Sequence, residues 1–582
     1  MIAAFPSQPP ALPGIAAPPL PKEELRRELA EAIKAPLFVA DLLLQRGIAD
    51  KESARAFFLA QPSEAERPEA IPALLGLDQA VARLRQARDE NQKVVVHGDY
   101  DVDGVTGTAL LYQGLLDLGF DCGWFIPNRF EEGYGITPGS LDKIKAQDAA
   151  LVISVDTGIV ACDEIAYAST LGMEVIVTDH HQAGVSLPPA LAIINPNQPG
   201  CPHPNKGLSG VGVAHALLCA LCECLPGCDP DDYLDLVALG SLADNVPVAG
   251  ANRPLIRRGL RRMAVTKSPG IRALIQKTGV SGDALTTSDI LFRVTPLLNA
   301  MGRMGSPEIS LRLLLSRDAV EADKHLATIL EVNLKRRQTD QAVTEAAYRL
   351  IDGDPDLRNA ACLVVGDAAW HEGVIGIVAA RLVERYGRPA FVLAYDADGK
   401  AKGSARTLPG FHLHKALGCV PELFEKWGGH YYACGFTLKA GCYPAFRSAM
   451  EKLAEKHLGE ATGPSPVQTA AWLDLSDLDE ESMLWLRRFE PFGPQNESPI
   501  FCAEDLELVD VPRVVGEKHL KFMVAKKDGV GISPTYDAIA FNMGHLAAAL
   551  QDKPSLKRIA FYPEWNHFRG RRKIQLRVVA LE

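Results

Sequence analysis

The sequence predicts an α/β protein in which a parallel-sheet domain is joined by a long helix to a smaller α/β domain and a C-terminal β-barrel. Between residues 76 and 330, apolar strand-like runs alternate with amphipathic helical stretches, which is typical of a parallel sheet with crossover helices. The stretch EVNLKRRQTDQAVTEAAYRLI reads as one long connecting helix. A second alternating region follows it, and residues 468–582 contain short strand-like runs with few strong helices, as in a small barrel.

The composition sets limits on the kind of protein. A chain of 582 residues is too long for a single core, so several domains are expected. The net charge of −11 argues against a uniformly basic nucleic-acid coat but leaves a nucleic-acid enzyme open, because local charge decides phosphate binding. The twelve cysteines are most simply reduced thiols of a cytoplasmic protein.

The first residues, MIAAFPSQPPALPGIAAPPLP, have no basic region before an apolar one and are not a secretory signal. Their seven prolines indicate a mobile tail. No apolar run approaches the roughly 20 residues of a membrane span, so no membrane partner is expected.

The alternation divides the chain into five regions. Strands are expected at residues 94–96, 151–155, 174–177 and 191–194, and helices at 105–118 and 162–171. The regions are a Pro-rich tail with a short helical segment (1–75), the parallel-sheet domain (76–330), the connecting helix (331–355), the second α/β domain (356–460) and the β region (468–582).

Acidic and imidazole side chains follow three of the predicted strands. VVVHGDYDVDG ends in Asp99, Asp101 and Asp103, LVISVDTG in Asp156, and VIVTDHH in Asp179, His180 and His181, while Asp244 follows an apolar helix. Parallel strands bind ligands beyond their carboxyl ends, so we expect these groups to converge at one edge of the sheet.

Converging carboxylates repel one another unless a cation lies among them. Carboxylates with imidazoles suit Mn²⁺ or Mg²⁺, and a pair of such ions about 3.5–4 Å apart is used for phosphoryl chemistry. Taken singly, a DxD pair is usually a loop or helix cap, and an adjacent His pair is usually solvated. The placement of every group at a strand end favours a site for two divalent cations.

A second group of possible ligands is Cys219, Cys222, Cys224 and Cys228. A structural zinc site is one reading. The other is buried thiols on an apolar helix, which is favoured because the second CxxC pair of a convincing zinc site is missing.

The motifs HGDYDVDG, VDTG, TDHH and LADNVP resemble those of the DHH phosphoesterase superfamily, and the resemblance covers nearly the whole chain. It is closest to the single-stranded-DNA-specific 5′→3′ exonucleases of that superfamily. KGSARTLPGFHL and GGHYYACGF resemble its DHH-associated second domain, and EPFGPQNESPIF resembles the start of a terminal OB-fold.

The resemblance implies roles for individual residues. The metal ligands would be Asp101, Asp103, Asp156, His180 and Asp244, with His97 a further candidate that only part of the superfamily shares. Asp156 would bridge two ions and act with His180 and His181 in catalysis, His181 beside the scissile phosphate. Asp99 and Asp179 would orient their neighbours.

The second domain would hold the DNA. Ser404 and Arg406 occupy alternate residues and would point the same way on a strand, where a hydroxyl and a guanidinium suit a terminal phosphate. The resemblance adds Arg129, Arg303 and His430. For each arginine taken alone, a surface ion pair is the alternative.

Two basic stretches have more than one interpretation. Near the end of the chain, Trp565 and Phe568 interleave with basic residues, either as a single-strand stacking surface or as a solvated hairpin. The stretch RPLIRRGLRR is either a phosphate-facing helix stripe or a solvated helix face.

The function that the resemblance implies is two-metal hydrolysis of single-stranded DNA from its 5′ end, in DNA repair and recombination, releasing 5′-mononucleotides. Its implied partners are single-stranded DNA, a single-strand-binding protein and a helicase, and the chain is expected to be a monomer. The alternatives are a phosphodiesterase for short oligonucleotides or cyclic dinucleotides, a non-catalytic DNA-binding scaffold, and, more weakly, a pyrophosphatase.

Overall fold

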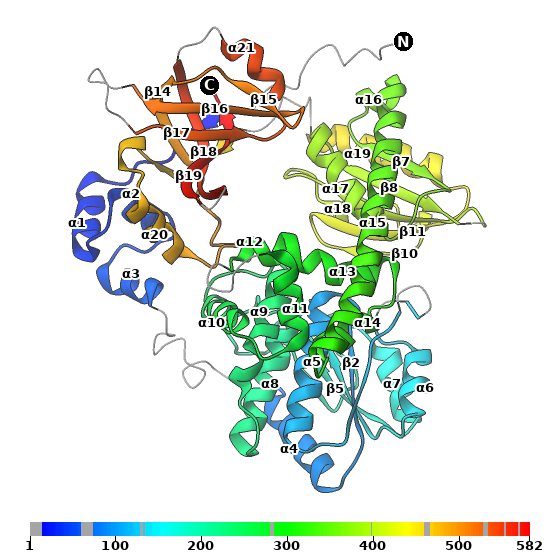
Figure 1. The fold of residues 1–582 in the computed structure, drawn as a ribbon. Coiled ribbons are helices and arrows are strands. Elements are labelled where there is room, and N and C mark those ends of the chain that lie inside the picture. The colour runs from blue at the N-terminus through cyan, green and yellow to red at the C-terminus, as the bar shows by residue number, and fades with distance from the viewer. Residues whose placement is uncertain are drawn as a thin grey trace.

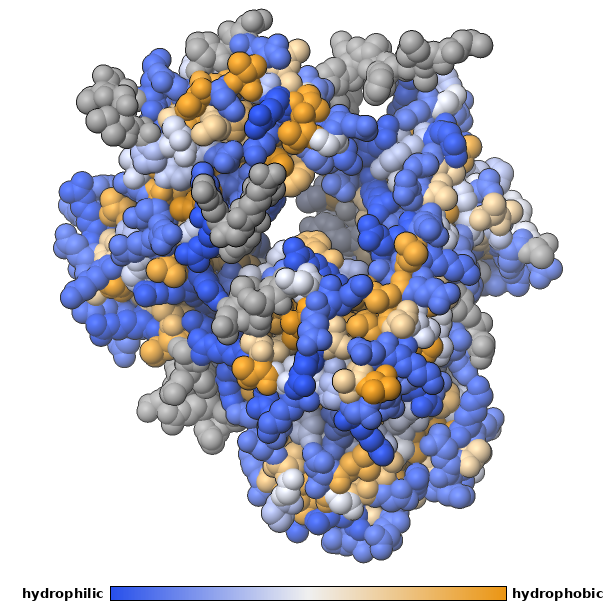
Figure 2. Space-filling view, in the orientation of Figure 1, coloured by the Kyte–Doolittle hydropathy of each residue, from blue (hydrophilic) through white to orange (hydrophobic). Residues whose placement is uncertain are grey.

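The computed structural model describes residues 14–59, 74–128, 132–133, 135–279, 285–396, 398–458, 466–527, 534–551, 555–568 and 571–582. Three folded parts surround a central opening (Figure 1). In the space-filling view, side chains bordering this opening are largely hydrophilic (Figure 2). The predicted fold class is confirmed: two α/β parts and a C-terminal β-sheet part are present.

The first part is built on a five-stranded parallel sheet of order β3-β2-β4-β5-β6. Its strands are β2 (Val94–Gly98), β3 (Cys122–Phe125), β4 (Leu151–Val155), β5 (Glu174–Thr178) and β6 (Ala192–Ile194). The four predicted strands are confirmed. The edge strand β3 was not predicted, because CGWF is short and partly exposed and has no run of β-branched residues.

Helices cover both faces of this sheet, which explains why its strands are apolar without alternation. Val94 and Val96 pack with α4 (Leu77–Asp89), α5 (Val102–Asp117) and α8 (Gly210–Cys224). Val95 faces the other way, toward α6 (Pro138–Lys145) and α7 (Cys162–Thr170). The sheet is therefore a rigid, buried platform whose carboxyl edge carries the acidic residues.

Helices complete this part and lead out of it: α9 (Leu234–Ala243), α10 (Asn252–Ala264), α11 (Pro269–Thr278), α12 (Thr287–Asp289), α13 (Thr295–Met304) and α14 (Glu308–Leu314). The predicted connecting helix is confirmed as α15 (Ala319–Gly353), which has 35 residues and begins earlier than expected, capped by Asp318. Despite that length, none of the described helices is apolar enough over a sufficient stretch to cross a bilayer.

The second part is a mixed five-stranded sheet of order β10-β11-β9-β8-β7. Its elements are α16 (Pro355–Asn359), β7 (Leu363–Asp367), α17 (Ile375–Tyr386), β8 (Ala390–Tyr395), β9 (Ala401–Arg406), α18 (Leu413–Leu417), β10 (Phe424–Gly429), β11 (Ala433–Leu438) and α19 (Tyr443–Leu458). Helix α17 packs on β8 and β9, and α15 joins the two α/β parts (Figure 1).

The third part is a curled seven-stranded sheet in which β14 also pairs with β16. Its elements are β13 (Ala471–Trp472), α20 (Glu480–Phe489), β14 (Phe501–Leu508), β15 (Arg513–Val515), β16 (His519–Lys526), β17 (Tyr536–Ala540), α21 (Ala547–Gln551), β18 (Ser555–Phe568) and β19 (Arg571–Leu581). The extra pairing curls the sheet, as the predicted barrel requires.

The N-terminal helices belong to this third part. Helices α1 (Glu23–Ile33), α2 (Leu37–Gln45) and α3 (Lys51–Phe58) share one hydrophobic core with the C-terminal strands. Phe38 packs edge-on against Phe501, with their ring centroids 5.7 Å apart. The chain therefore closes its last part with residues from its beginning.

The Pro-rich start departs from the predicted mobile tail at β1 (Ile15–Ala16), which pairs in parallel with β12 (Val467–Gln468). Ile15 is buried, and its backbone N–H donates to the carboxylate of Glu582 at 2.9 Å. The predicted mobility is wrong for these two residues, because their backbone pairs with β12. Residues 1–13 lie outside the described ranges.

The basic stripe on α10 is used within the protein. Arg258 and Arg262 pair with Asp231 and Asp232, and Arg257 donates to the carbonyls of Phe58 and Leu59. Neither interpretation of the stripe, phosphate-facing or simply solvated, describes these residues.

Burial at the end of α20 makes stability depend on pH. Burial raises the pKa of Glu490 to about 7, above its usual 4.5. The folded state therefore holds the proton more tightly, and this contribution to stability is present below pH 4.5 and lost as pH rises through 7. At pH 8, Glu490→Gln should be more stable than the parent by roughly 1–3 kcal/mol and should unfold at a higher temperature. At pH 4.5 the variant and the parent should unfold at about the same temperature.

The matched control is Glu481→Gln, an exposed position on α20. Thermal unfolding at both pH values checks the effect. An equal change in both variants would contradict a role for burial.

Candidate functional site

The acidic and imidazole residues meet where the strand order reverses. Strand β2 lies between β3 and β4, so consecutive crossovers leave in opposite directions and open a crevice at the carboxyl ends of β2 and β4. Asp99 follows β2, Asp156 follows β4, and Asp179 follows β5. The predicted convergence at one edge of the sheet is confirmed.

Three groups in this crevice have ligand atoms within 4.8 Å of one another. Asp156 belongs to two of the groups, and His180 also belongs to two, so the three form one continuous cluster. The groups are Asp156 with His180 and His181, Asp103 with His180 and Asp244, and Asp99 with Asp101 and Asp156. Five of the six predicted ligands are in this cluster, and His97 is not.

Helix N-termini fix two of the carboxylates. Asp101 caps α5, its Oδ1 accepting from the backbone N–H groups of Asp103 and Gly104. Asp103 accepts from the first amides of α8, Gly210 at 2.6 Å and Val211 at 2.8 Å. The positive helix ends and these hydrogen bonds hold negative charge in place.

Asp156 has an unusual backbone. Its φ is 61°, in the left-handed region that Asp tolerates better than most residues. Gly210 lies against it, and a Cβ there would be 2.5 Å from the Cβ of Asp156. Only glycine allows α8 to approach so closely, and this local strain is typical of functional sites.

The two histidines are held by different partners. His181 Nδ1 is 2.8 Å from Asp179 Oδ1, and the same oxygen accepts from both backbone amides of the pair. His180 Nε2 lies 3.1 Å from Asp156 Oδ1 and 3.6 Å from Asp244 Oδ2. Asp179 thus fixes the backbone of the pair and the ring of His181.

Two positioning residues were missed from the sequence. Asn195 Nδ2 donates to the carbonyl of His181 at 3.0 Å, and Asn197 Nδ2 donates to that of His180 at 2.6 Å. Both follow β6 in the stretch IINPNQ. The signal was available, because polar amides directly after a predicted strand lie at the same sheet edge.

Carboxylates in this crevice resist ionisation. Burial, followed by the charges of neighbouring aspartates, raises the pKa of Asp99, Asp103 and Asp156 well above 3.8. Burial and the charge of Asp101 raise the pKa of Asp244 to about 7. Folding alone does not explain such a concentration of acids, which costs stability unless a cation compensates it.

The imidazoles have diverging pKa values. Burial, followed by the charge of nearby His181, lowers the pKa of His180 to about 4, so His180 is neutral and able to bind a metal. Burial alone would lower the pKa of His181, but the hydrogen bond and charge of Asp179 raise it to about 9.

The donor set fits divalent cations. Asp156 Oδ1 and His180 Nε2 are buried, face each other and have no hydrogen-bond partner in the described residues. Such orphaned atoms are rare unless something else satisfies them. Carboxylate oxygens with one or two imidazoles suit Mn²⁺ or Mg²⁺.

Two candidate ligand groups lie apart from this cluster. His97 is buried at the end of β2, where Nε2 is 3.2 Å from Ser140 Oγ, and it belongs to none of the metal-competent groups. Cys219, Cys222 and Cys228 are partly buried and Cys224 is exposed. Within the described ranges, no metal-competent group contains a cysteine. The expected burial is wrong, because none of these four thiols is fully buried and Cys228 lies beyond the end of α8.

Ser404 and Arg406 point the same way from β9, as predicted, and Arg406 donates to Ser404 Oγ at 3.1 Å. Both lie at the start of α17, where a Cβ on Gly376 would be 3.0 Å from Ser404 Oγ and 3.1 Å from an Arg406 nitrogen. Helix α17 begins without a side-chain cap, and its amides and the buried guanidinium together favour an anion.

The other predicted DNA-binding residues are spread more widely. Arg303, near the end of α13, donates to the carbonyl of Gly373, just before α17, while His430 is near enough for its charge to affect the pKa of His180. Arg129 lies outside the described residues. Trp565 carries Arg572 3.9 Å above its ring, and the side chain of Phe568 is not described.

Comparisons with known proteins identify the class first. The family described as "DHH family, N-terminal domain" matches residues 93–241, "DHHA1 domain" matches residues 359–456, and "RecJ OB domain" matches residues 469–580. These matches, in this order, define a DHH-family enzyme with its associated domain and an OB domain.

Individual relatives identify the family within this class. The single-stranded-DNA-specific exonuclease RecJ of Bacillus subtilis (strain 168) is 35% identical over 562 residues, 96% of this chain and 69% of that protein. A crystal structure of RecJ with Mn²⁺ from Thermus thermophilus has a TM-score of 0.80 and 31% identity over 98% of this chain and 79% of that one. The crystal structure of the same protein with Mg²⁺ has a TM-score of 0.75 and 30% identity, over 98% of this chain and 78% of that one. The chain belongs to the RecJ family.

Proposed function

We propose that this protein is a single-stranded-DNA-specific 5′→3′ exonuclease that releases 5′-mononucleotides with the help of divalent cations. The carrying observation is the continuous cluster of buried aspartates and histidines at the switch point of the first sheet. Membership of the RecJ family supports the substrate. The C-terminal sheet, which matches an OB domain, disfavours an enzyme restricted to dinucleotides.

We assign the metal ligands to Asp101, Asp103, Asp156, His180 and Asp244, with Asp156 shared between two Mn²⁺ or Mg²⁺ ions. Bound there, these cations supply charge neutralisation and a lowered pKa for the attacking water. His97 is not assigned, because its ring contacts Ser140 and lies outside the metal-competent groups.

His181 acts on the phosphate rather than on a metal. Its Nδ1–H donates to Asp179 and its pKa is raised to about 9, so its Nε2 also carries a proton at neutral pH. That proton is available to a phosphate oxygen and offsets the charge that develops there. Asn195 and Asn197 keep the loop in place.

The second domain holds the 5′ end. Arg406 and Ser404 lie together at the uncapped start of α17, with Arg303 beside them. A terminal phosphate bound there and a scissile phosphate at the metal cluster would fix how far the strand enters. Cleavage would therefore occur at the end of the strand rather than at internal positions. His430 and Arg129 are proposed to line the same path.

The function is tested with single strands labelled at either end, incubated with Mn²⁺, Mg²⁺ or EDTA, with a duplex control. We expect a 5′ label to appear immediately as mononucleotide, a 3′ label to remain on progressively shorter strands, and EDTA to stop both. Early release of the 3′ label, or cleavage in EDTA, would contradict the proposal.

We further propose that the C-terminal part stacks DNA bases on Trp565 and its overlying Arg572, with Phe568 nearby. Trp565→Ala should raise KM for a ~30-mer about 10-fold, because stacking on an aromatic is worth roughly 1–3 kcal/mol per base. Cleavage of a dinucleotide, which is too short to reach this surface, should not change. Trp565→Phe is the control and should retain most of the affinity; equal losses on both substrates would disprove the role.

The partners follow from the substrate. Single strands in cells are coated by single-strand-binding protein and arise where a helicase opens duplexes, so we propose both as partners in cytoplasmic DNA repair and recombination, with the enzyme acting as a monomer.

A further inference from the structure

A pocket lies where the N-terminal helices, the start of α10 and the chain leaving α20 meet. Its volume is about 210 Å³. Three arginines line it: Arg46 from the end of α2, and Arg253 and Arg257 from α10. The pocket thus joins segments that are far apart in the sequence and concentrates positive charge between them.

Two of these guanidinium groups, those of Arg46 and Arg257, donate to neutral groups. Arg46 donates to Asn496 Oδ1 at 2.8 Å and to the carbonyl of Glu497 at 2.9 Å. Arg257 donates to the carbonyls of Phe58 and Leu59. Within the described part of the chain, neither arginine forms an ion pair with a carboxylate.

Burial leaves that charge poorly compensated. It lowers the pKa of both Arg46 and Arg257, and the carboxylates of Glu497 and Glu490 only partly offset the effect. Buried charges without a partner are expensive. The carbonyl contacts fix the orientation of the guanidiniums. Those from Phe58 and Leu59, at the C-terminal end of α3, supply partial negative charge but no full counter-charge.

The backbone adds to the positive potential. Val248, Ala249 and Gly250, which line the pocket, lead directly into α10. This helix of 13 residues begins after Ala251 without a side-chain cap, so its dipole favours an anion at this end. Its first amides contribute little, because Asn252 already donates to the carbonyl of Ala249 and Pro254 has no N–H. The helix end alone would not define a site; together with the arginines it points to the same ligand charge.

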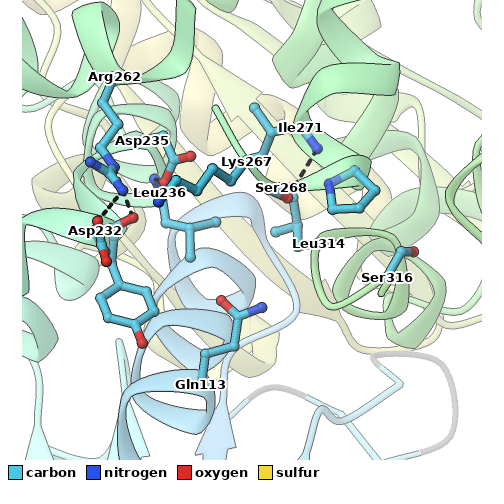
Figure 3. A pocket seen from close by; sticks show the side chains of 12 residues that line it. Gln113, Asp232, Asp235, Leu236, Arg262, Lys267, Ser268, Ile271, Leu314 and Ser316 are labelled. Carbon is cyan, nitrogen blue, oxygen red and sulfur yellow. Dashed lines mark hydrogen bonds and ion pairs between the residues drawn. The ribbon is translucent and has the colours of Figure 1, made fainter. Parts of the chain in front are cut away.

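A second pocket, of about 180 Å³, lies elsewhere on α10 and lacks this imbalance (Figure 3). There Arg262 pairs with Asp232, and Ser268 Oγ accepts from the backbone of Ile271. Asp235 accepts from Thr266 at 2.6 Å. The arginine of this pocket is therefore paired with a carboxylate, whereas Arg46 and Arg257 donate to neutral groups.

We propose that the arginine pocket binds a phosphate group, either as free phosphate or as the phosphate of a nucleoside 5′-monophosphate. A guanidinium fork suits phosphate geometry, and apolar walls such as Ile48 and Pro254 give room for part of a carrier. The volume is below the roughly 300–1,000 Å³ of pockets for larger ligands. The bound anion would fasten the N-terminal helices and the third part to the catalytic domain.

The test compares Arg257→Gln with Arg258→Gln in the full-length protein, without metal and in EDTA. Arg258 is next to Arg257 on α10 but pairs with Asp231 outside the pocket. Phosphate should raise the unfolding temperature of the parent above that in chloride of equal ionic strength, since a ligand of the folded state stabilises it. Arg258→Gln should show the same rise, and calorimetric titration should show about tenfold or greater loss of phosphate affinity in Arg257→Gln.

Because Arg406 offers another anion site, the comparison is repeated in an Arg406→Gln background, where the dependence on Arg257 should persist. Tighter binding of dAMP than of phosphate would assign the nucleotide as ligand, and equal binding would assign free phosphate. The proposal is overturned if phosphate and chloride act alike on the parent, if Arg257→Gln responds as Arg258→Gln does, or if only an oligonucleotide gives an Arg257-dependent response.

Discussion

Replacing Asp156 with asparagine should reduce cleavage of single-stranded DNA by roughly 10³-fold or more, because the proposed bridge between two cations would lose its charge. Asparagine keeps the side-chain shape and tolerates the positive φ of this position. The loss of activity should therefore occur without loss of the fold. Initial rates with saturating Mn²⁺ and a 5′-labelled strand provide the measurement.

Stability distinguishes a lost ligand from a damaged fold. Burial and neighbouring carboxylates raise the pKa of Asp156, so the neutral variant should unfold at a higher temperature than the parent in EDTA at pH 7.5, and Mn²⁺ should stabilise it less. Asp163→Asn, an exposed acid at the start of α7, should behave as the parent. Retention of activity in Asp156→Asn would contradict the two-metal assignment.

Arg406→Gln should lower kcat/KM about 10–100-fold on strands with a 5′ phosphate, because a charge-assisted contact to that phosphate is removed. The preference of the parent for a 5′ phosphate over a 5′ hydroxyl should disappear. Competition between the two substrates in one reaction measures this ratio directly.

Lys402→Gln is the control for this variant. Lys402 lies on the same strand but pairs with Glu372 and is largely exposed, so its loss should leave the phosphate preference intact. If Arg406→Gln retains the full preference, the 5′ phosphate is bound elsewhere.

Much of the catalytic domain could be predicted from the sequence because its strands are buried on both faces. Such strands appear as short apolar runs, and the side chains that follow them must share one edge. This is why Asp101, Asp156 and His180 could be brought together before any coordinates. The edge strand β3 could not be predicted in this way, because it is partly exposed and has no apolar run.

Other features depend on contacts that no local pattern records. The ring of His97 turns to Ser140, because His97 lies within β2, whereas the acids follow the strands. The arginines of α10 follow a helical stripe, yet their partners are carbonyls of α3 and acids before α9. Tertiary partners, rather than periodicity, decide such roles.

The union of α1–α3 with the last strands has a consequence for biosynthesis. Gln45 donates a hydrogen bond to the carbonyl of Ala470, 425 positions further along the chain. At a translation rate of roughly 5–20 residues per second, the emerging helices wait about half a minute or longer for the strands that cover them. During that interval the apolar faces of these helices are exposed at the ribosome. Chaperones would therefore bind the N-terminal helices well before the barrel is synthesised.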